Sequence, residues 1–237
     1  MPGKVLIVIP CYNEEASLPS VLNELEHTTL PGDYQMSVLI VNDCSKDNTS
    51  AVARKSQAIV IDLPVNLGIG GAVQTGILYA RDNNFDLAIQ LDGDGQHPPK
   101  ELAKLINYHL ETGANVVIGS RFLEKEGFQS SFARRLGIKY FHLLNRIMTG
   151  LSIYDSTSGF RLFDRKAIEI AAINYPDEYP EPESLVVFSK AGLKIVEVAV
   201  VMSHRLGGQS SIRHFGSLYY CIKVSLAMLF SFIRKTS

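Results

Sequence analysis

The chain has 237 residues, of which 46% are hydrophobic and 20% are charged, and this composition excludes intrinsic disorder as its main state. Lysine and arginine number 23 against 24 aspartate and glutamate residues, so the formal net charge of −1 argues against a dedicated nucleic-acid-binding protein. The 3 cysteines (Cys11, Cys44 and Cys221) match no zinc-ligand spacing and cannot all form disulfides, which favours a reducing compartment.

The first half of the chain alternates apolar runs with segments of helical spacing. Strands are predicted over 4–10, 37–43, 58–63, 86–94 and 115–121, and helices over 14–26, 49–56, 71–83 and 99–112. Apolar strands that alternate with helices predict a mostly parallel sheet covered on both faces. Such sheets bind ligands outside the carboxyl ends of their strands. Polar segments follow four of these strands and are expected to meet there, at 11–15, 42–47, 66–71 and 92–97.

The second half is less regular. Helices are predicted over 132–149 and 166–173 and a strand over 193–201, while 155–163 is polar and turn-rich. A basic loop at 204–211 precedes an apolar helix over 218–233, which is shorter than the roughly 20 residues that a membrane-spanning helix needs. No acidic residue follows Glu197, so the C-terminal end predicts an anionic partner.

The strongest candidate for chemistry is the pair Asp92 and Asp94, at the end of the fourth predicted strand. Two carboxylates so close together repel each other unless a cation lies beside them. Mg²⁺ and Mn²⁺ take oxygen ligands and often share them with substrate phosphates, and Gln96 can add an amide oxygen. A solvated Asp-Gly turn is the alternative. An EF-hand is disfavoured because its sixth loop position is His97 rather than glycine.

The polar segments after the first two strands are candidates for nucleotide binding. Tyr12 can stack on a base, and Asn13 with Glu14 can bind a ribose or a base edge; an ordinary strand-to-helix turn is the alternative. Asp43 directly follows a strand, where its carboxylate can accept a hydrogen bond from uracil or from a ribose hydroxyl. Asp47 is expected to cap the next helix rather than to bind a ligand.

The glycine-rich segment 66–76 permits close backbone approach at the start of a helix, where free N–H groups favour anions. It is not a dinucleotide-binding fingerprint, because Val73 stands where the third glycine is required. It is not a phosphate-binding loop of the Walker type either, because Ile77 rather than lysine follows Gly76.

Taken in order, the segments IPCYNEE, VNDCSKDNT, NLGIGGA, LDGDGQHPP, GSRF and DSTSGFRLF resemble glycosyltransferase family 2. The family has the GT-A fold, a Rossmann-like α/β arrangement for nucleotide-diphospho-sugar transfer. The resemblance is to the branch of dolichol-phosphate-mannose synthases and polyprenyl-phosphate glycosyltransferases, and it covers about residues 4–212. It implies a catalytic domain over 1–212, followed by a basic amphipathic C-terminal helix over 213–237.

The resemblance implies roles for individual residues. Four positions match nucleotide-contacting residues and form the predicted nucleotide site with Asn13, Asn66, Gly70 and Asp92; they are Pro10, Tyr12, Glu14 and Asp43. The implied ligands of Mg²⁺ or Mn²⁺ are Asp92, Asp94 and Gln96, and Asp94 is also counted as catalytic. The positions that resemble phosphate- and acceptor-binding residues are Arg121, Arg134, Arg135, Arg205 and Ser210.

Asp155 falls in the segment DSTSGFR, where some relatives are thought to keep a catalytic carboxylate; the alternative is that it anchors Arg161. The segment 178–188 departs from the family pattern. Family members that use hydroxyl acceptors often carry an acidic base followed by Gln-x-x-Arg-Trp, and this chain contains no tryptophan. That departure favours a phosphate acceptor, although Glu181 or Glu183 can still serve as a base.

We therefore expect an inverting, metal-dependent glycosyltransferase that moves a sugar from a nucleotide sugar, expected to be a UDP-sugar, to a polyprenyl phosphate in cell-envelope glycan synthesis. The alternatives are a glycan or other hydroxyl acceptor and, more remotely, a non-catalytic nucleotide-sugar-binding protein. The C-terminal helix is predicted to bind a membrane surface or a small membrane protein; packing on the enzyme's own core and a homodimer interface are its alternatives. We expect a cytoplasmic protein, peripheral on the inner face of the cytoplasmic membrane.

Overall fold

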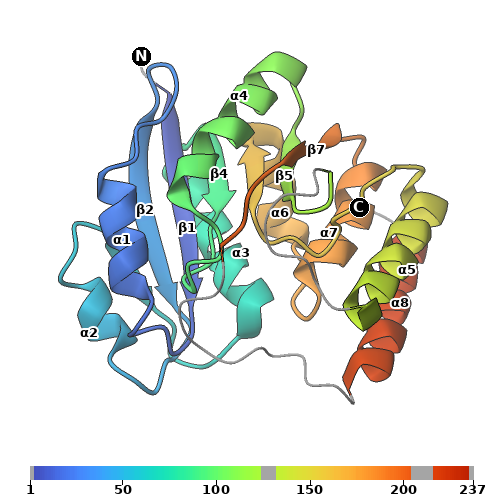
Figure 1. The fold of residues 1–237 in the computed structure, drawn as a ribbon, viewed down its shortest axis with the longest axis horizontal. Helices are drawn as coiled ribbons and strands as arrows, with labels where there is room; N and C mark the ends of the chain where they lie inside the picture. The colour runs from blue at the N-terminus through green and yellow to red at the C-terminus, as the bar shows by residue number, and fades with distance from the viewer. Residues whose placement is uncertain (1–2, 124–131, 204–215, 235–237) are drawn as a thin grey trace.

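The computed structural model describes residues 3–123, 132–203 and 216–234 (Figure 1). Their elements, in chain order, are β1 (Lys4–Cys11), α1 (Leu18–Glu26), β2 (Gln35–Asn42), α2 (Thr49–Ala53), β3 (Ile59–Asp62), α3 (Gly68–Asp82), β4 (Leu87–Gln90), the 3-10 turn η1 (Pro99–Glu101), α4 (Leu102–Thr112), β5 (Val116–Ser120), α5 (Phe132–Thr149), β6 (Arg161–Asp164), α6 (Arg165–Asn174), α7 (Pro180–Lys190), β7 (Ile195–Ala199) and α8 (Gly216–Ile233).

The strands of the described residues form one 7-stranded sheet in the order β3-β2-β1-β4-β6-β5-β7. Four neighbouring pairs are parallel, whereas β6 is antiparallel to both β4 and β5. The mostly parallel α/β sheet is therefore confirmed. The sequence pattern does not predict β6, because its apolar run consists only of Leu162 and Phe163 and follows a turn-rich segment.

Helices cover both faces of the sheet, which explains why β1, in its middle, is apolar from Val5 onwards. In β1, Val5, Ile7 and Ile9 pack in one core layer together with the apolar sides of α1 and α4. The alternate residues Leu6 and Val8 pack in a second layer with α3, α6 and α7. The period-2 alternation of a strand thus sends neighbouring side chains to opposite layers.

A third, smaller core lies where α5, α7 and α8 pack together beside the sheet (Figure 1). Its buried members are Phe141, Val186, Val224 and Met228. The C-terminal helix α8 therefore packs on the protein itself through one of its sides, which was one of the alternatives for this segment. The predicted domain boundary at 212/213 lies outside the described residues. No helix in the described ranges is long and apolar enough to cross a membrane.

Some element boundaries differ from the sequence prediction. The first helix begins at Leu18 rather than at residue 14, because the residues before it form a loop that binds the loop after β2. Strand β4 ends at Gln90, so Asp92 and Asp94 lie in the loop that follows it. Helix α7 was not predicted; its residues are buried on more than one side, which removes the amphipathic pattern that reveals a surface helix.

Candidate active site

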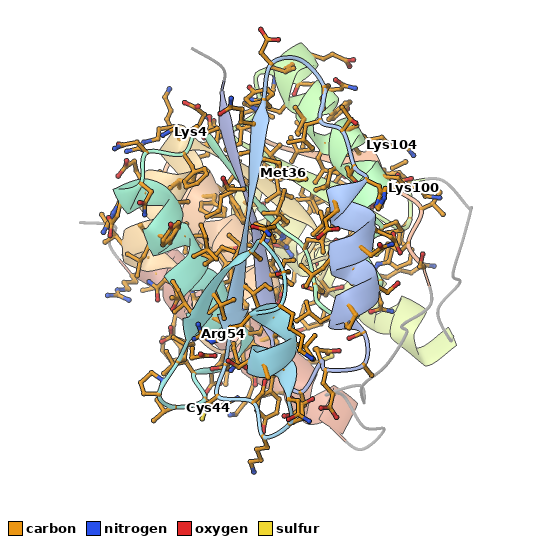
Figure 2. All side chains as sticks on the ribbon, turned by 90° about the vertical axis from the view of Figure 1, so that its left-hand side faces the viewer. Lys4, Met36, Cys44, Arg54, Lys100 and Lys104 are labelled. Carbon is orange, nitrogen blue, oxygen red and sulfur yellow. The ribbon has the colours of Figure 1, made fainter. Side chains whose placement is uncertain are left out.

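The loops at the carboxyl ends of β1 and β2 lie together at one end of the sheet, as predicted. Figure 2 shows Lys4, at the start of β1, at one end of the molecule and Cys44, in the loop after β2, at the other. The backbone N–H of Asn13 donates to Ser45 Oγ (2.9 Å), and Asn13 Oδ1 accepts from the N–H of Lys46 (2.8 Å). Asn13, predicted to contact nucleotide, thus holds the two loops together, with a φ of 57° that asparagine tolerates.

Acidic side chains make further contacts between these two loops. Asp47 Oδ1 accepts from the N–H of Thr49, the first residue of α2, at 3.0 Å, although the N-cap position of this helix is Asn48 rather than Asp47. Glu15 Oε2 accepts from both the backbone and the side-chain nitrogen of Asn48 at 2.9 Å, a role that the sequence analysis missed. Glu14 Oε2 accepts from Ser17 Oγ at 2.5 Å. Tyr12 is 44% exposed beside this network, so its ring is accessible for the predicted stacking on a base.

Asp43 is buried, and both of its carboxylate oxygens accept hydrogen bonds from the start of α3. Oδ1 accepts from the N–H of Leu67 (2.6 Å) and Oδ2 from the N–H of Gly68 (2.9 Å). Asn66 in turn donates from Nδ2 to the carbonyl oxygen of Asp43 (3.0 Å). Asp43 and Asn66, both predicted to bind nucleotide, are therefore brought together, and their hydrogen bonds fix the segment that begins α3.

Close packing explains why position 70 is a glycine. A Cβ atom at this position would lie 2.1 Å from the carbonyl oxygen of Asp177 and 2.4 Å from that of Pro176. Glycine thus allows the segment before α7 to contact the first turn of α3. Pro10 is buried in β1, where it lies in register with Val41 of β2.

The Asp92–Asp94 loop is held in a definite shape by its neighbours. The backbone N–H of Asp92 donates to His97 Nδ1 (3.1 Å), and the His97 ring stacks on Phe160 with centroids 5.0 Å apart. Asp94 Oδ1 accepts from the N–H of Gln96 at 2.9 Å. The three predicted metal ligands are therefore brought into one loop beside a buried imidazole that fixes its start.

The donor set of this loop fits a hard divalent cation. Asp92 and Asp94 supply carboxylate oxygens and Gln96 an amide, the ligand types that Mg²⁺ and Mn²⁺ prefer. Gly159 keeps space beside the first carboxylate, since a Cβ there would lie 3.3 and 3.4 Å from the two Asp92 oxygens. Among the described residues no group of three or more histidine, cysteine, aspartate or glutamate side chains has metal-binding geometry, so the predicted set remains two carboxylates and one amide.

A buried ion pair follows β5, next to this loop. Arg121 donates from Nε to Asp155 Oδ2 and from Nη2 to Asp155 Oδ1, both at 2.7 Å. The side chain of Asp155 is 0% exposed and that of Arg121 is 15% exposed. Burial opposes the charged guanidinium, but the hydrogen bonds and charge of Asp155 outweigh it and raise the pKa of Arg121. The nearby charge of Asp92 acts in the same direction.

The alternative in which Asp155 anchors Arg161 is therefore wrong. Arg161 is fully buried and donates to the carbonyl oxygens of Ser158 (2.7 Å) and Ser156 (2.8 Å) and to Ser184 Oγ (2.9 Å). It folds the loop before β6 and fixes α7, while Asp155 binds Arg121 instead. Asp155 was also predicted to be catalytic; its burial and its two-point contact with Arg121 favour a role in orienting that guanidinium.

Two acidic residues of α7 were considered as a base, and the structure separates them. Glu183 Oε1 accepts from Ser231 Oγ of α8, so it belongs to the helix interface. Glu181 lies where the charges of Arg161, Asp92 and Arg121 act on it. Burial raises the pKa of Glu181, and the charge of Arg161 opposes that rise.

The remaining predicted phosphate-binding residues are not placed. Arg134 and Arg135 belong to the first turns of α5, whose side chains are outside the described residues. Arg205 and Ser210 fall in 204–215, which is also outside them. These assignments stay predictions.

The comparisons with known proteins agree with the motif set. Residues 6–170 match the model of the family described as glycosyl transferase family 2. The chain belongs to this family. It is therefore a glycosyltransferase, which confirms the predicted enzyme class.

Two relatives have names that describe sugar transfer to a lipid phosphate. The chain is 30% identical to an undecaprenyl-phosphate mannosyltransferase of Micrococcus luteus, over 88% of this chain and 87% of that protein. It is 28% identical to a UDP-N-acetylglucosamine–dolichyl-phosphate N-acetylglucosaminyltransferase of Methanococcus voltae, over 83% of this chain and 84% of that protein. The predicted resemblance to the lipid-phosphate branch is confirmed by such relatives.

A solved structure confirms the GT-A fold. It is glucosyl-3-phosphoglycerate synthase from Mycobacterium tuberculosis, in complex with Mn²⁺, UDP-glucose and phosphoglyceric acid. The TM-score is 0.71, with 21% sequence identity over 99% of this chain and 81% of that one.

Proposed function

We propose that the protein transfers a sugar from a nucleoside diphosphate sugar, in the first instance a UDP-sugar, to a polyprenyl phosphate. The relatives named for undecaprenyl and dolichyl phosphate support this acceptor class. The observation that carries the proposal is the Arg121–Asp155 pair beside the Asp92–Asp94 loop. It holds a guanidinium, the group best suited to phosphate oxygens, next to the loop proposed to bind the donor diphosphate.

In the proposed mechanism the protein mainly positions two phosphorylated substrates. Tyr12 stacks on the base, and the loops fixed by Asn13 and Asp43 form the surrounding wall. Arg121 holds the acceptor phosphate in line with the anomeric carbon and offsets its repulsion from the donor diphosphate. A lipid phosphate is already ionised near neutral pH and needs no general base. A divalent cation held by Asp92, Asp94 and Gln96 would supply charge neutralisation for the leaving nucleotide.

A hydroxyl acceptor is the second candidate, and Glu181 is the observation that favours it. A hydroxyl must lose its proton during transfer, and a base is most effective when its pKa lies near the working pH. Burial moves the pKa of Glu181 in that direction. On this alternative Glu181 would accept the proton, and Arg121 would bind only the donor.

Sugar transfer to undecaprenyl phosphate tests the proposal. The protein is incubated with Mn²⁺, a panel of UDP- and GDP-sugars and the lipid, and the lipid extract is analysed by mass spectrometry. A glycosyl phospholipid that is absent with the Asp94→Asn variant supports the proposal and identifies the sugar. The proposal is refuted if UDP binds but no lipid product forms, while an oligosaccharide acceptor is glycosylated and Glu181→Gln abolishes that reaction. The acceptor is then a hydroxyl group, with Glu181 as the base.

The outer side of the α5–α8 pair suits a lipid surface. Exposed apolar residues follow helical spacing along α8 at Ile222, Leu226 and Phe230, and along α5 at Leu143 and Ile147. Neither helix contains an acidic residue; α5 carries several basic residues, and α8 carries one, Lys223, which pairs with Glu178 at 3.6 Å. An apolar helix face with basic flanks binds an anionic bilayer surface. We therefore assign this face to anionic lipid, which brings the enzyme to its acceptor.

Vesicle sedimentation checks this surface. The double variant Ile222→Glu with Phe230→Glu should lose binding to vesicles that contain 30% phosphatidylglycerol by about tenfold or more, because it places charge where apolar groups meet lipid. The matched control, Leu110→Glu with Ile173→Glu, changes exposed apolar residues of α4 and α6 and should bind as the wild type does. Equal binding by both variants would contradict the assignment.

A further inference from the structure

Glu197 of β7 is a partly buried carboxylate that the proposed mechanism does not use. Its two oxygens accept hydrogen bonds from consecutive backbone N–H groups, Oε2 from Tyr154 (2.6 Å) and Oε1 from Asp155 (2.7 Å). Hydrogen bonds to a charged acceptor are the strong ones, and two of them on adjacent residues fix the backbone in position and direction. The loop that carries Asp155 is thus held from β7, the edge strand beyond β5.

The same loop holds Arg121 at several points. Besides the bidentate pair, the backbone N–H of Arg121 donates to Asp155 Oδ2 (3.1 Å), and Arg121 Nη2 donates to Thr157 Oγ1 (3.2 Å). The orientation of the guanidinium therefore depends on where the loop lies. Among the described residues, Arg121 Nη1 has no hydrogen-bond partner, so its two N–H groups are the ones left for a phosphate.

We infer that Glu197 is a positioning residue for the acceptor phosphate: it sets the Asp155 backbone, and through it the direction in which Arg121 presents Nη1. The inference rests on the proposed function, because it takes a phosphate as the ligand of Arg121. A purely structural role would require only that some acceptor satisfies the two N–H groups. The chain instead uses a carboxylate, although burial and, more weakly, the charge of Asp155 both raise its pKa, costs that a neutral acceptor would avoid. The same carboxylate also accepts from the side chain of Ser120, the residue directly before Arg121.

The test uses Glu197→Gln, which removes the charge and one of the two acceptors at constant size. Binding of farnesyl phosphate and of UDP with Mn²⁺ is measured separately by calorimetry. Farnesyl phosphate should bind about tenfold more weakly, while the affinity for UDP changes by less than about twofold. The reason is that a misoriented Arg121 weakens only the binding of the phosphate that it contacts. The matched control is Glu101→Gln, which alters a buried carboxylate that accepts from the N–H of Val201, just after β7, and should change neither affinity.

A double-mutant cycle separates positioning from general stability. In an Arg121→Lys background, Glu197→Gln should weaken farnesyl phosphate binding by less than about twofold, because residues that act through one another are not additive. Additive losses, or a loss of UDP affinity equal to that of farnesyl phosphate, would overturn the inference. If Glu197→Gln does not fold, Glu197→Asp, which keeps the charge but shortens the side chain that reaches the N–H groups of Tyr154 and Asp155, takes its place with the same expected pattern.

A readout without substrate keeps this inference distinct from the proposed function. The Nε–H of Arg121, identified in a nitrogen-15 spectrum by its loss in Arg121→Lys, should exchange slowly with water in the wild type and at least tenfold faster in Glu197→Gln. Unchanged exchange would overturn the role of Glu197. If the wild-type protein binds no farnesyl phosphate, the proposed acceptor fails, and faster exchange in Glu197→Gln would still support Glu197 as the group that orients Arg121.

Discussion

Removing the carboxylate of Asp155 should destabilise the fold strongly. Asp155 is fully buried and the side chain of Arg121 is 15% exposed, with both hydrogen bonds of the pair at 2.7 Å. The Asp155→Ala variant leaves a largely buried guanidinium without its counter-charge. Breaking a buried pair in this way costs about 3–5 kcal/mol. For a chain of this size that corresponds to a fall in Tm of about 6–20 °C.

Urea unfolding followed by circular dichroism measures this loss. The control is Glu169→Ala, which breaks the ion pair of Arg165 and Glu169 on α6, where the side chains are 42% and 46% exposed. An exposed pair of this spacing contributes only about 0.3–0.5 kcal/mol. The two variants should therefore differ in free energy of unfolding by several kcal/mol, although each removes one carboxylate from one arginine.

A compensated variant makes the reasoning refutable. Replacing both partners, as in Arg121→Met with Asp155→Leu, leaves no unpaired charge, so most of the stability lost in Asp155→Ala should return. The same double variant should not bind farnesyl phosphate. If Asp155→Ala is within about 1 kcal/mol of the wild type, as the exposed control is expected to be, the pair does not depend on burial and the argument for a fixed Arg121 fails.

Three further predictions concern the other side of the site. Asp94→Asn should abolish the effect of Mn²⁺ on UDP affinity, measured by calorimetry with and without the metal; an unchanged metal effect would remove Asp94 from the site. Gly159→Ala should lower Mn²⁺ affinity about tenfold, because the new Cβ would lie 2.7 Å from the buried Gln90 amide nitrogen, which donates to Asp92, and would press on the Asp92 carboxylate. Asp47→Ala should cost about 1 kcal/mol at pH 7 through the lost hydrogen bonds from the N–H groups of Thr49 and Glu15, read from urea unfolding. Burial raises the pKa of Asp47, but hydrogen bonds from Thr49 and Glu15 outweigh it and lower it below 3.8, so this difference should persist above pH 3.8 and shrink as pH falls below it.

The parallel half of the sheet was predictable because strands that are buried on both faces consist almost entirely of apolar residues, a pattern that is visible in the sequence. Strands β1 and β4 are buried along almost their whole length, so their sequences are apolar except for Lys4 at the start of β1 and Gln90 at the end of β4. The sequence cannot show in the same way which side chains meet across the second half. Arg121 and Asp155 are 34 positions apart, and no periodicity links them. Their contact depends on β6, whose apolar run of two residues carries almost no pattern.

The loops at the carboxyl ends of the strands show a different limit. The sequence places Asn13 and Asp43 correctly at this end, and their residue types suit a nucleotide. In the structure their side-chain oxygens accept from backbone N–H groups of neighbouring loops. Buried N–H groups of irregular backbone need hydrogen-bond acceptors. Polar side chains at strand ends can supply these acceptors whether or not they also bind a ligand. Residue type alone does not distinguish a side chain that pairs with backbone N–H groups from one that binds a nucleotide.

Strand β6 explains why the two halves of the proposed site lie together. It is inserted antiparallel between β4 and β5, so the loop before it passes the ends of both strands. Ser158 Oγ donates to the carbonyl oxygen of Gly119 (2.7 Å), and the Gly119 N–H donates to the carbonyl oxygen of Phe160 (2.8 Å). On one side this loop presents Gly159 to Asp92; on the other it presents Asp155 to Arg121. One short segment therefore sets the spacing between the proposed donor and acceptor phosphates, and changes within it should alter transfer more than they alter the binding of either substrate alone.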